Sequence, residues 1–298
     1  MISVVIPAFN EEAAISETVR SVRSTLEGAG IRPVEIIVVD DASTDKTGEL
    51  AREAGAAVIQ KIQNIGYGHS LKLGITAATF DTIAIIDADA TYPVEQIPNL
   101  LAQHRRGFHM VVGARTGKHY RESWYKHPMR LLLKALVEFA AGRSIPDPNS
   151  GLRVFSRSDA LQILPTLCDQ FSFTTSMTLA YMMRSLYVLY IDIDYDKRVG
   201  KTKVKLLKDS LVTLQYIVQA VTYYNPIKIF LVLSGLTGVS ALFLLGVGLI
   251  FSIKTAIQLG VGAVLTTVLI FALGLLADLL RQILAHSRPN NEGDGSRP

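Results

Sequence analysis

Short apolar runs alternate with segments of helical periodicity in the first part of the chain. Five runs are expected to be buried strands, at residues 3–7, 34–39, 57–59, 82–86 and 110–113. Between them, apolar residues at intervals of three and four predict helices at 12–27, from 44 onward, at 67–79 and at 94–105. Strands that alternate with helices indicate an α/β domain with a mainly parallel sheet, where ligands bind beyond the carboxyl ends of the strands.

The pattern changes after Asn225, where two long apolar runs follow each other. Residues 229–253 carry no charge, and residues 256–278 contain few polar side chains. Each run is long enough to cross a hydrocarbon core of ~30 Å as a helix. The short link between them predicts a transmembrane hairpin, with a buried helical pair of a soluble protein as the alternative.

We therefore expect four parts along the chain. They are an α/β domain at 1–202, a juxtamembrane amphipathic helix at 203–225, a transmembrane hairpin at 226–284 and a disordered polar tail at 285–298. Residues 124–141 are also amphipathic. Both amphipathic stretches are expected to lie in the headgroup plane of a bilayer. Ordinary core helices are the alternative, more so for the first stretch.

Composition and charge agree with a membrane protein. Hydrophobic residues make up 49% of the chain, and the excess lies after Asn225. The net charge is +4, and basic residues gather beside the apolar runs, where anionic headgroups attract them. Because no nucleic-acid-binding motif accompanies this charge, we expect a lipid bilayer as partner and no nucleic acid.

The chain termini are expected on the cytoplasmic side. The N-terminus lacks the charged region of a signal peptide, so the large N-terminal domain should stay in the cytoplasm, and a hairpin returns the C-terminus there. Basic flanks on both sides of the hairpin agree with this orientation. The single cysteine, Cys168, excludes an internal disulfide. We expect a multi-pass protein of the plasma (inner) membrane with both termini cytoplasmic.

Acidic pairs follow two of the predicted strands. Asp40 and Asp41 follow the second, and Asp87 and Asp89 follow the fourth as a D-x-D pair. Carboxylate and phosphate oxygens suit Mg²⁺ or Mn²⁺, so the expected ligand is a metal diphosphate and hence a nucleotide. A simple turn-capping role is the alternative for the first pair.

The familiar nucleotide-binding loops are absent from the sequence. There is no G-x-G-x-x-G at the first strand and no G-x-x-x-x-G-K-[ST] anywhere. Gly66-Tyr67-Gly68 is a lone G-x-G, which is too weak a signal for a phosphate loop. A nucleotide would therefore be bound by a different architecture.

Six short motifs, in order, resemble the signature of family 2 glycosyltransferases. They are VVIPAFNE at 4–11, VVDDASTD at 38–45, NIGYG at 64–68, DAD at 87–89, GAR at 113–115 and NSGLR at 149–153. The subgroup is similar to dolichol-phosphate mannose synthase and bacterial polyprenyl-phosphate glucosyltransferases. The resemblance covers about residues 2–205, and the C-terminal hairpin fits the membrane-spanning members.

The resemblance implies a GT-A fold and an inverting, metal-dependent sugar transfer. The donor would be a nucleotide sugar, a GDP- or UDP-hexose, and the acceptor a polyisoprenyl (dolichyl or undecaprenyl) phosphate. The cofactor would be Mg²⁺ or Mn²⁺, the activity would be mannosyltransferase-like, and the product would be a lipid-phosphate-sugar. A homo-oligomer is compatible with the sequence.

The resemblance also assigns residues by position. Those expected to contact the donor are Pro7, Phe9, Glu11, Val38, Asp40, Asp87, Ala88, Asp89, Arg115, Arg198 and Lys203. Of these, Asp87, Asp89 and Arg115 are the candidate catalytic residues, and Asp87 and Asp89 would bind the metal with Thr91. Ser150 and Arg153 would lie near the acceptor.

Two positions depart from the pattern of the family. Thr91 stands where Gln is often a third metal contact, and Phe9 stands where Tyr is common. Arg115 also has an alternative as a solvated salt-bridge residue. Trp124 is expected as an interface anchor, with a sugar-stacking platform as its alternative.

Two rival functions make different predictions. A processive polysaccharide synthase carries a Q-x-x-R-W motif, whereas the only tryptophan here, Trp124, stands in Glu-Ser-Trp. A non-catalytic membrane adaptor could keep the fold for binding alone. The intact acidic pair, together with Arg115 and Arg198, argues against that alternative.

Overall fold

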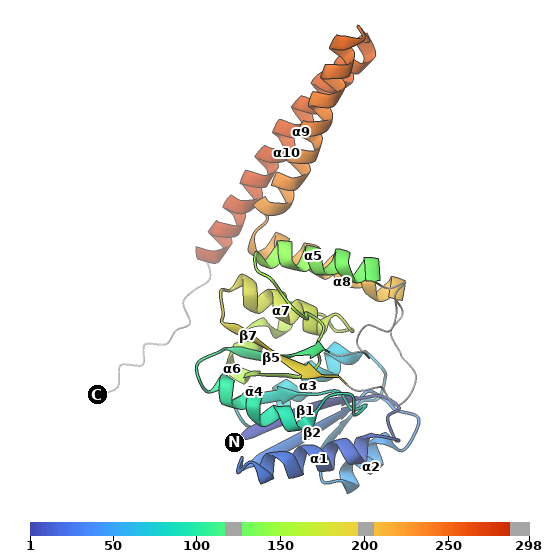
Figure 1. Ribbon diagram of the computed structural model, residues 1–298, viewed down its shortest axis with the longest axis vertical. Coiled ribbons are helices and arrows are strands. Elements are labelled where there is room, and N and C mark those ends of the chain that lie inside the picture. Colours follow the sequence, from blue (N-terminus) through green and yellow to red (C-terminus); the bar gives the residue numbers. More distant parts are fainter. Residues whose placement is uncertain (117–126, 196–205, 287–298) are drawn as a thin grey trace, which may run out of the picture. The chain divides into compact units, whose positions relative to one another are not determined.

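The computed structural model describes residues 1–116, 127–195 and 206–286, with the side chains of 127–133, 206–210 and 284–286 left aside. The chain divides into two units, Met1–Ile217 and Val218–Pro298. Figure 1 shows an α/β unit and a helical unit. Arg198, Lys203 and Trp124 lie outside the described residues.

A mixed, mainly parallel sheet forms the centre of the first unit. Its strands are β1 (Ile2–Ala8), β2 (Val34–Asp40), β3 (Ala57–Gln60), β4 (Thr82–Ile85), β5 (Met110–Thr116), β6 (Arg153–Ser156) and β7 (Val188–Asp194). They lie in the order β3-β2-β1-β4-β6-β5-β7. Only β6 runs antiparallel to its neighbours, β4 and β5. The predicted mainly parallel sheet is confirmed.

Helices cover both faces of this sheet (Figure 1). They are α1 (Ile15–Gly28), α2 (Thr47–Glu53), α3 (Tyr67–Ala77), α4 (Ile97–His104) after a 3₁₀ turn η1 (Val94–Gln96), α6 (Arg157–Ile163) with the 3₁₀ turn η4 (Leu164–Thr166), and α7 (Phe173–Met183). The helix α5 (His127–Ala141) packs against α7. Strand residues of one face pack in a core with the buried side of α1. On the opposite face, Gly74 of α3 lies against Val5 and Val39.

The central strands β1 and β2 contain long apolar runs, and both faces of the sheet are covered there. Val4 and Val38 enter the core with α1, whereas Val5 and Val39 face α3, and all four side chains are fully buried. Such unbroken apolar runs are typical of parallel strands buried on both sides. The helical spacing of α1 has the same cause, since its buried residues recur every three or four positions.

The helix α8 (Leu206–Tyr224) leads from the first unit into the second. Its exposed apolar residues include Leu211 and Val218, while Ile217 and Val221 are buried. The helix α5 is similarly divided, with Val137 buried and Phe139 exposed. Both helices are therefore amphipathic, as the sequence predicts.

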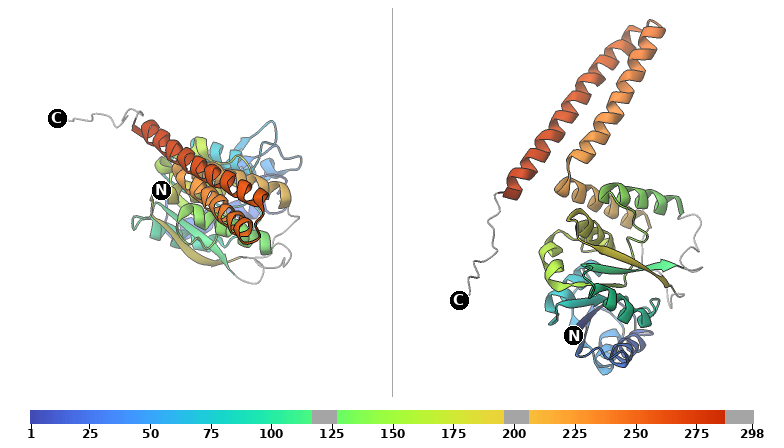
Figure 2. Two further views of the ribbon diagram at one scale, coloured as in Figure 1. Left: turned by 90° about the horizontal axis from the view of Figure 1, so that it is seen from above. Right: turned by 60° about the vertical axis from the view of Figure 1, so that its left-hand side comes forward.

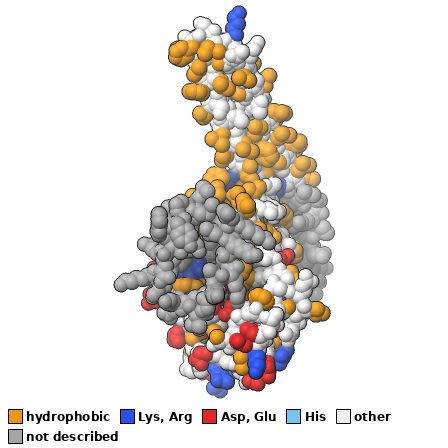
Figure 3. Space-filling model, turned by 90° about the vertical axis from the view of Figure 1, so that its right-hand side faces the viewer, with side chains coloured by type: hydrophobic (Ala, Val, Ile, Leu, Met, Phe, Trp, Pro, Cys, Tyr) orange, Lys and Arg blue, Asp and Glu red, His pale blue; other side chains and the backbone are white. Residues whose placement is uncertain are grey.

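The second unit is a hairpin of α9 (Ile227–Ile250) and α10 (Lys254–His286). Small residues bring the helices together, with Gly260 against Leu245 and Gly274 against Phe230. Both helices are long and apolar enough to cross a membrane, by length and composition. Figure 2 shows the two helices side by side, and hydrophobic side chains cover much of the hairpin surface visible in Figure 3. The two predicted apolar helices are confirmed, with α10 extending beyond the expected end at residue 278.

Candidate active site at the sheet edge

The topology brings the predicted polar loops to one edge of the sheet. The strands β1, β2, β3 and β4 are mutually parallel, and β5 and β7 share their direction because β6 alone is reversed. The carboxyl ends of these six strands therefore meet at the same edge as the amino end of β6. The loops and strand ends there include residues 9–11, 40–45, 87–91, 115–116 and 147–152.

Three of these loops contain a non-glycine residue with a left-handed backbone. Asn10, Ala42 and Ala90 have φ values of 51°, 61° and 56°. This conformation costs about 1 kcal/mol or more for most residues, and it concentrates at ligand-binding and active sites. The first two loops also support each other, because Asn10 Oδ1 accepts the backbone N–H of Thr44 at 2.8 Å. The three left-handed residues at this edge make it a candidate functional site.

The D-x-D loop follows β4 directly. Asp87 is half-buried and accepts a hydrogen bond from the Tyr67 hydroxyl at 2.8 Å. Asp89 is buried, and its Oδ1 accepts both the backbone N–H of Thr91 at 3.3 Å and the Thr91 hydroxyl at 2.6 Å. In this structure Thr91 therefore orients Asp89, and its own side chain is completely buried.

The carboxylate pair fits a divalent metal that is shared with a diphosphate. Within the described ranges no group of three or more His, Cys, Asp or Glu residues is arranged to hold a metal by itself. Mg²⁺ usually binds through only one or two carboxylates, with substrate phosphates and water completing its octahedral shell. Asp87 and Asp89 would supply the two carboxylates of such a shell.

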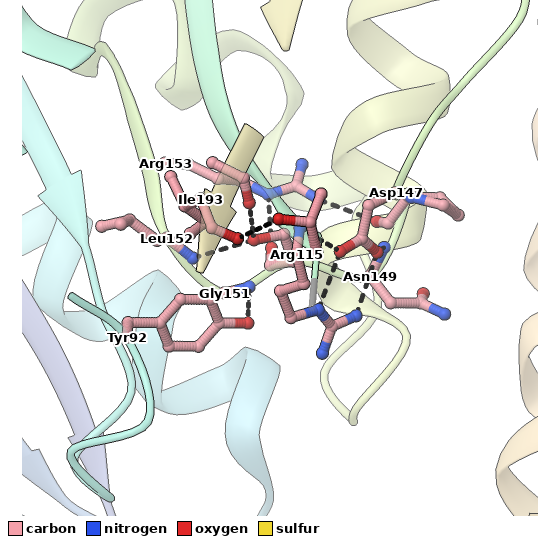
Figure 4. A network of polar contacts seen from close by, with 12 residues as sticks. Tyr92, Arg115, Asp147, Asn149, Gly151, Leu152, Arg153 and Ile193 are labelled. Atoms are coloured by element: carbon pink, nitrogen blue, oxygen red, sulfur yellow. Dashed lines mark hydrogen bonds and ion pairs between the residues drawn. The ribbon is translucent and has the colours of Figure 1, made fainter. Parts of the chain in front are cut away.

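Arg115, near the end of β5, forms a two-pronged ion pair with Asp147 (Figure 4). Its Nε lies 2.7 Å from Oδ2 of Asp147, and its Nη2 lies 2.9 Å from Oδ1. Burial opposes ionisation of Asp147, but the charge and hydrogen bonds of Arg115 outweigh it, so the pKa of this carboxyl lies below its ordinary value of 3.8. The guanidinium also lies 5.4 Å from the ring centroid of Tyr195. Arg115 is therefore held in one orientation.

Two tyrosines connect the acidic loop to its neighbours. The ring of Tyr92 packs edge-on against Tyr195 at a centroid distance of 5.2 Å. The Tyr92 hydroxyl accepts the backbone N–H of Gly151 at 2.7 Å. Burial raises the pKa of both phenols, which keeps them protonated at neutral pH. Tyr195 also hydrogen-bonds Thr91. The loops after β4 and β7 and the loop before β6 are thus packed together.

The expected acceptor residues are completely buried. Ser150 donates a hydrogen bond to the Gly113 carbonyl at 2.5 Å. Arg153 donates to the carbonyls of Ser150 and Pro148 and to the Thr178 hydroxyl. Both side chains are engaged inside the protein, and their place near the acceptor stays a prediction. They hold the loop that carries Asp147 and Gly151.

The expected donor residues divide into surface and core positions. Val38 is a core residue of β2 and Pro7 is buried in β1, and the expected contact of these two residues with the donor stays a prediction. Phe9 and Glu11 lie in the partly exposed loop after β1, and Ala88 is buried within the D-x-D loop. The candidate side chains therefore come from the loops and from the last residues of the strands.

The structure also divides the roles of the paired aspartates after β2. Asp40 accepts the backbone N–H of Ser43 at 2.9 Å, a contact that fits the alternative of a turn-capping role. It also accepts a hydrogen bond from the Gln60 side chain at 3.2 Å. Asp41 forms a buried ion pair with Lys61 and accepts the backbone N–H groups of Ile65 and Gly66. Asp41 therefore anchors the 64–68 loop.

Sequence reasoning missed several residues of this site. Asp147 stands in Pro-Asp-Pro-Asn, a composition typical of turns, which could have marked it as a polar loop residue. Tyr67 lies in the NIGYG motif but was given no role. Tyr92 and Tyr195 carried no recognisable signal, because single tyrosines at irregular spacing are common in cores. Their roles depend on contacts across the sheet edge.

Comparison with known proteins identifies the family. The profile described as glycosyl transferase family 2 matches residues 3–164. The chain belongs to glycosyl transferase family 2. The resemblance inferred from the six motifs is thereby confirmed.

Curated relatives of this family 2 chain are sugar transferases. It is 33% identical over 213 residues to the low-salt glycan biosynthesis hexosyltransferase Agl6 of Haloferax volcanii, covering 70% of this chain and 51% of that protein. It is 28% identical over 221 residues to the undecaprenyl-phosphate 4-deoxy-4-formamido-L-arabinose transferase of Edwardsiella ictaluri, with 72% and 66% covered. The chain thus spans about half to just under two thirds of their length.

A solved structure supports the fold of this family 2 chain. The glucosyl-3-phosphoglycerate synthase of Mycobacterium tuberculosis, in complex with Mn²⁺, UDP-glucose and phosphoglyceric acid, superposes with a TM-score of 0.60 at 22% identity. The match covers 74% of this chain and 79% of that one. The expected GT-A-type fold is confirmed.

Proposed function

We propose that this chain transfers a hexose, with inversion, from a GDP- or UDP-sugar to a polyisoprenyl phosphate. The observation that carries the proposal is the convergence of Asp87, Asp89 and Arg115 at one sheet edge, in a chain with two candidate membrane spans. Acidic groups for a metal diphosphate lie there beside a cation, and the hairpin suits an enzyme whose acceptor is a lipid.

The relatives support both halves of this proposal. The name of the Edwardsiella ictaluri protein specifies undecaprenyl phosphate, and the Mycobacterium tuberculosis enzyme was solved with UDP and either Mn²⁺ or Mg²⁺. We therefore propose Mg²⁺ or Mn²⁺ as cofactor, held by Asp87 and Asp89. When bound, the metal neutralises charge on the departing diphosphate.

The acceptor chemistry explains why no strong general base is required. A phosphate monoester has a second pKa of ~6 and is largely ionised at neutral pH, so it can attack the anomeric carbon directly. The protein must instead bring two anions together and stabilise the leaving charge. Arg115, held by Asp147, is proposed to face those phosphates, and Arg198 and Lys203 are proposed to add charge from a basic loop.

The remaining expectations become parts of the same proposal. Phe9, Glu11 and Asp40 would lie near the nucleoside. Ser150 and Arg153 would shape the acceptor side through the loop that they hold. The amphipathic helices α5 and α8 would lie in the headgroup plane, and the domain and both termini would face the cytoplasm.

An assay of labelled lipid products tests the function. Membranes that contain the full chain are incubated with a panel of UDP- and GDP-sugars and polyprenyl phosphate, with and without EDTA. We expect label in a lipid-phosphate-sugar for one donor, lost with EDTA and restored by Mg²⁺ or Mn²⁺. Label in polymer would instead favour a processive synthase, and nucleotide binding without transfer to any lipid would favour an adaptor.

A further inference from the structure

The Gly66-Tyr67-Gly68 motif ends in a direct contact with the acidic pair. The Tyr67 hydroxyl donates to Asp87 Oδ1 at 2.8 Å, although the two residues follow different strands. We propose that Tyr67 is a positioning residue, which fixes the orientation of the Asp87 carboxylate for a metal diphosphate. This inference rests on the metal site of the proposed function and extends it.

Both glycines of the motif are required by a close approach to the chain at 168–170. A Cβ on Gly68 would lie 2.2 Å from the carbonyl oxygen of Cys168. A Cβ on Gly66 would lie 2.8 Å from the carbonyl oxygen of Asp169, and its φ of +133° disfavours any side chain. The two glycines therefore allow the chain at 66–68 to pack closely against residues 168–170, which places Tyr67 beside this segment.

The same segment supplies a ring that stacks on Tyr67. The Phe171 and Tyr67 rings are 5.9 Å apart between centroids, with an interplanar angle of 17°. From the other direction, Asp41 binds the backbone N–H groups of Ile65 and Gly66 and pairs with Lys61. Tyr67 is thus held through its backbone and through its ring.

Asp87 is confined from a second direction by Gly151. A Cβ at that position would lie 2.7 Å from Oδ2 and 2.8 Å from Oδ1 of Asp87. The carboxylate therefore lies between the phenol of Tyr67 and the backbone of Gly151. The directions of the two carboxylate oxygens determine where a cation can bind. A hydrogen-bond donor that fixes these directions therefore changes the affinity for the metal without contacting the metal.

Tyr67 acts on the site through the carboxylate that it orients. Its hydroxyl donates to Asp87 Oδ1 at 2.8 Å. Outer partners that orient metal ligands typically change metal affinity by about 10–100-fold when they are removed. An effect of that size is measurable independently of turnover.

Binding of Mn²⁺ tests the inference without an activity assay. The full-length chain in detergent is titrated with Mn²⁺ in the presence of UDP and, in a parallel series, GDP, and free Mn²⁺ is measured by electron paramagnetic resonance. We expect Tyr67→Phe to weaken Mn²⁺ binding about 10-fold. Phe171→Leu, which keeps the hydroxyl but loosens the ring, should weaken it less.

Tyr187→Phe is the matched control. It removes the same hydroxyl from a tyrosine whose side chain is 65% exposed, and it should bind Mn²⁺ as the wild type does. A purely structural role would lower the melting temperature of Tyr67→Phe and leave Mn²⁺ affinity unchanged. Affinity within twofold of wild type for Tyr67→Phe would overturn the inference and leave the proposed function standing. Absence of nucleotide-dependent Mn²⁺ binding in the wild type would overturn both.

Discussion

Arg115 and Asp147 are paired through two hydrogen bonds, of 2.7 and 2.9 Å, between a guanidinium edge and both carboxylate oxygens. The Asp147 side chain is 2% exposed and that of Arg115 is 16% exposed. Breaking such a pair by removing one partner leaves a poorly hydrated charge behind, which costs more than the pair contributes. This pair is therefore a sensitive point of the candidate site.

Asp147→Asn should destabilise the first unit and impair transfer. An amide can accept from only one side and places its NH₂ against an arginine donor, so we expect a loss of about 2–3 kcal/mol. This corresponds to a fall in melting temperature of roughly 5–10 °C, measurable by differential scanning fluorimetry. Glu27→Gln, which removes the acid of a surface pair, should change it by no more than about 2 °C. Equal shifts for both variants would contradict the prediction.

The stabilisation by Asp147 should depend on pH in a defined window. Its folded pKa is lower than its unfolded value, so its contribution is fully present above that unfolded value of ~3.9 and is lost as the pH falls through the folded pKa. The difference in melting temperature between wild type and Asp147→Asn should therefore be constant from about pH 5 to 7 and narrow below about pH 4. A difference that changes between pH 5 and 7, or persists undiminished to pH 3, would show that another group is responsible.

Asp89→Asn should separate function from folding. The Asn oxygen can still accept both hydrogen bonds from Thr91, so the melting temperature should stay within about 2 °C of wild type. Loss of one metal-facing charge should reduce sugar transfer by about 100-fold or more. Glu53→Gln, at an exposed position at the end of α2, is the control and should retain full activity. Undiminished transfer by Asp89→Asn would refute the metal site.

Gly151→Ala should disturb Asp87 directly. The added Cβ would stand 2.7–2.9 Å from the atoms of the Asp87 carboxyl group, closer than real Cβ contacts allow. Asp87 or the 147–152 loop must move, so we expect weaker Mn²⁺ binding and at least about 10-fold lower transfer. Gly28→Ala is a suitable control, because no atom lies within 4 Å of its Cβ position. Full transfer activity in the alanine variant at 151 would show that this contact does not constrain Asp87.

The sequence predicted more of the fold than of the site. The buried helix positions Ile15, Val19, Val22 and Leu26 follow from their spacing alone, since one helical face must leave water. The acidic pair at 87 and 89 followed from its position after a strand. In contrast, the sequence suggested that Arg153 lies near the acceptor. In the structure its side chain is fully buried and donates to three oxygen acceptors, which the tertiary structure brings around it.

Local sequence patterns therefore predicted the first five strands with the helices between them, the two long apolar helices and the loops that carry charge, but not β6, β7, α6 or α7. Periodicity, turn residues and apolar length act over a few residues and can be read along the chain. Only the tertiary structure decided the partners of those charges. Tyr67 meets Asp87, Arg115 meets Asp147 and Gly151 meets Asp87 because β6 is inserted, reversed, between β4 and β5 and because the chain at 168–170 packs on the Gly66 loop. Such contacts join residues that are 20 to 64 positions apart, and no local pattern encodes them.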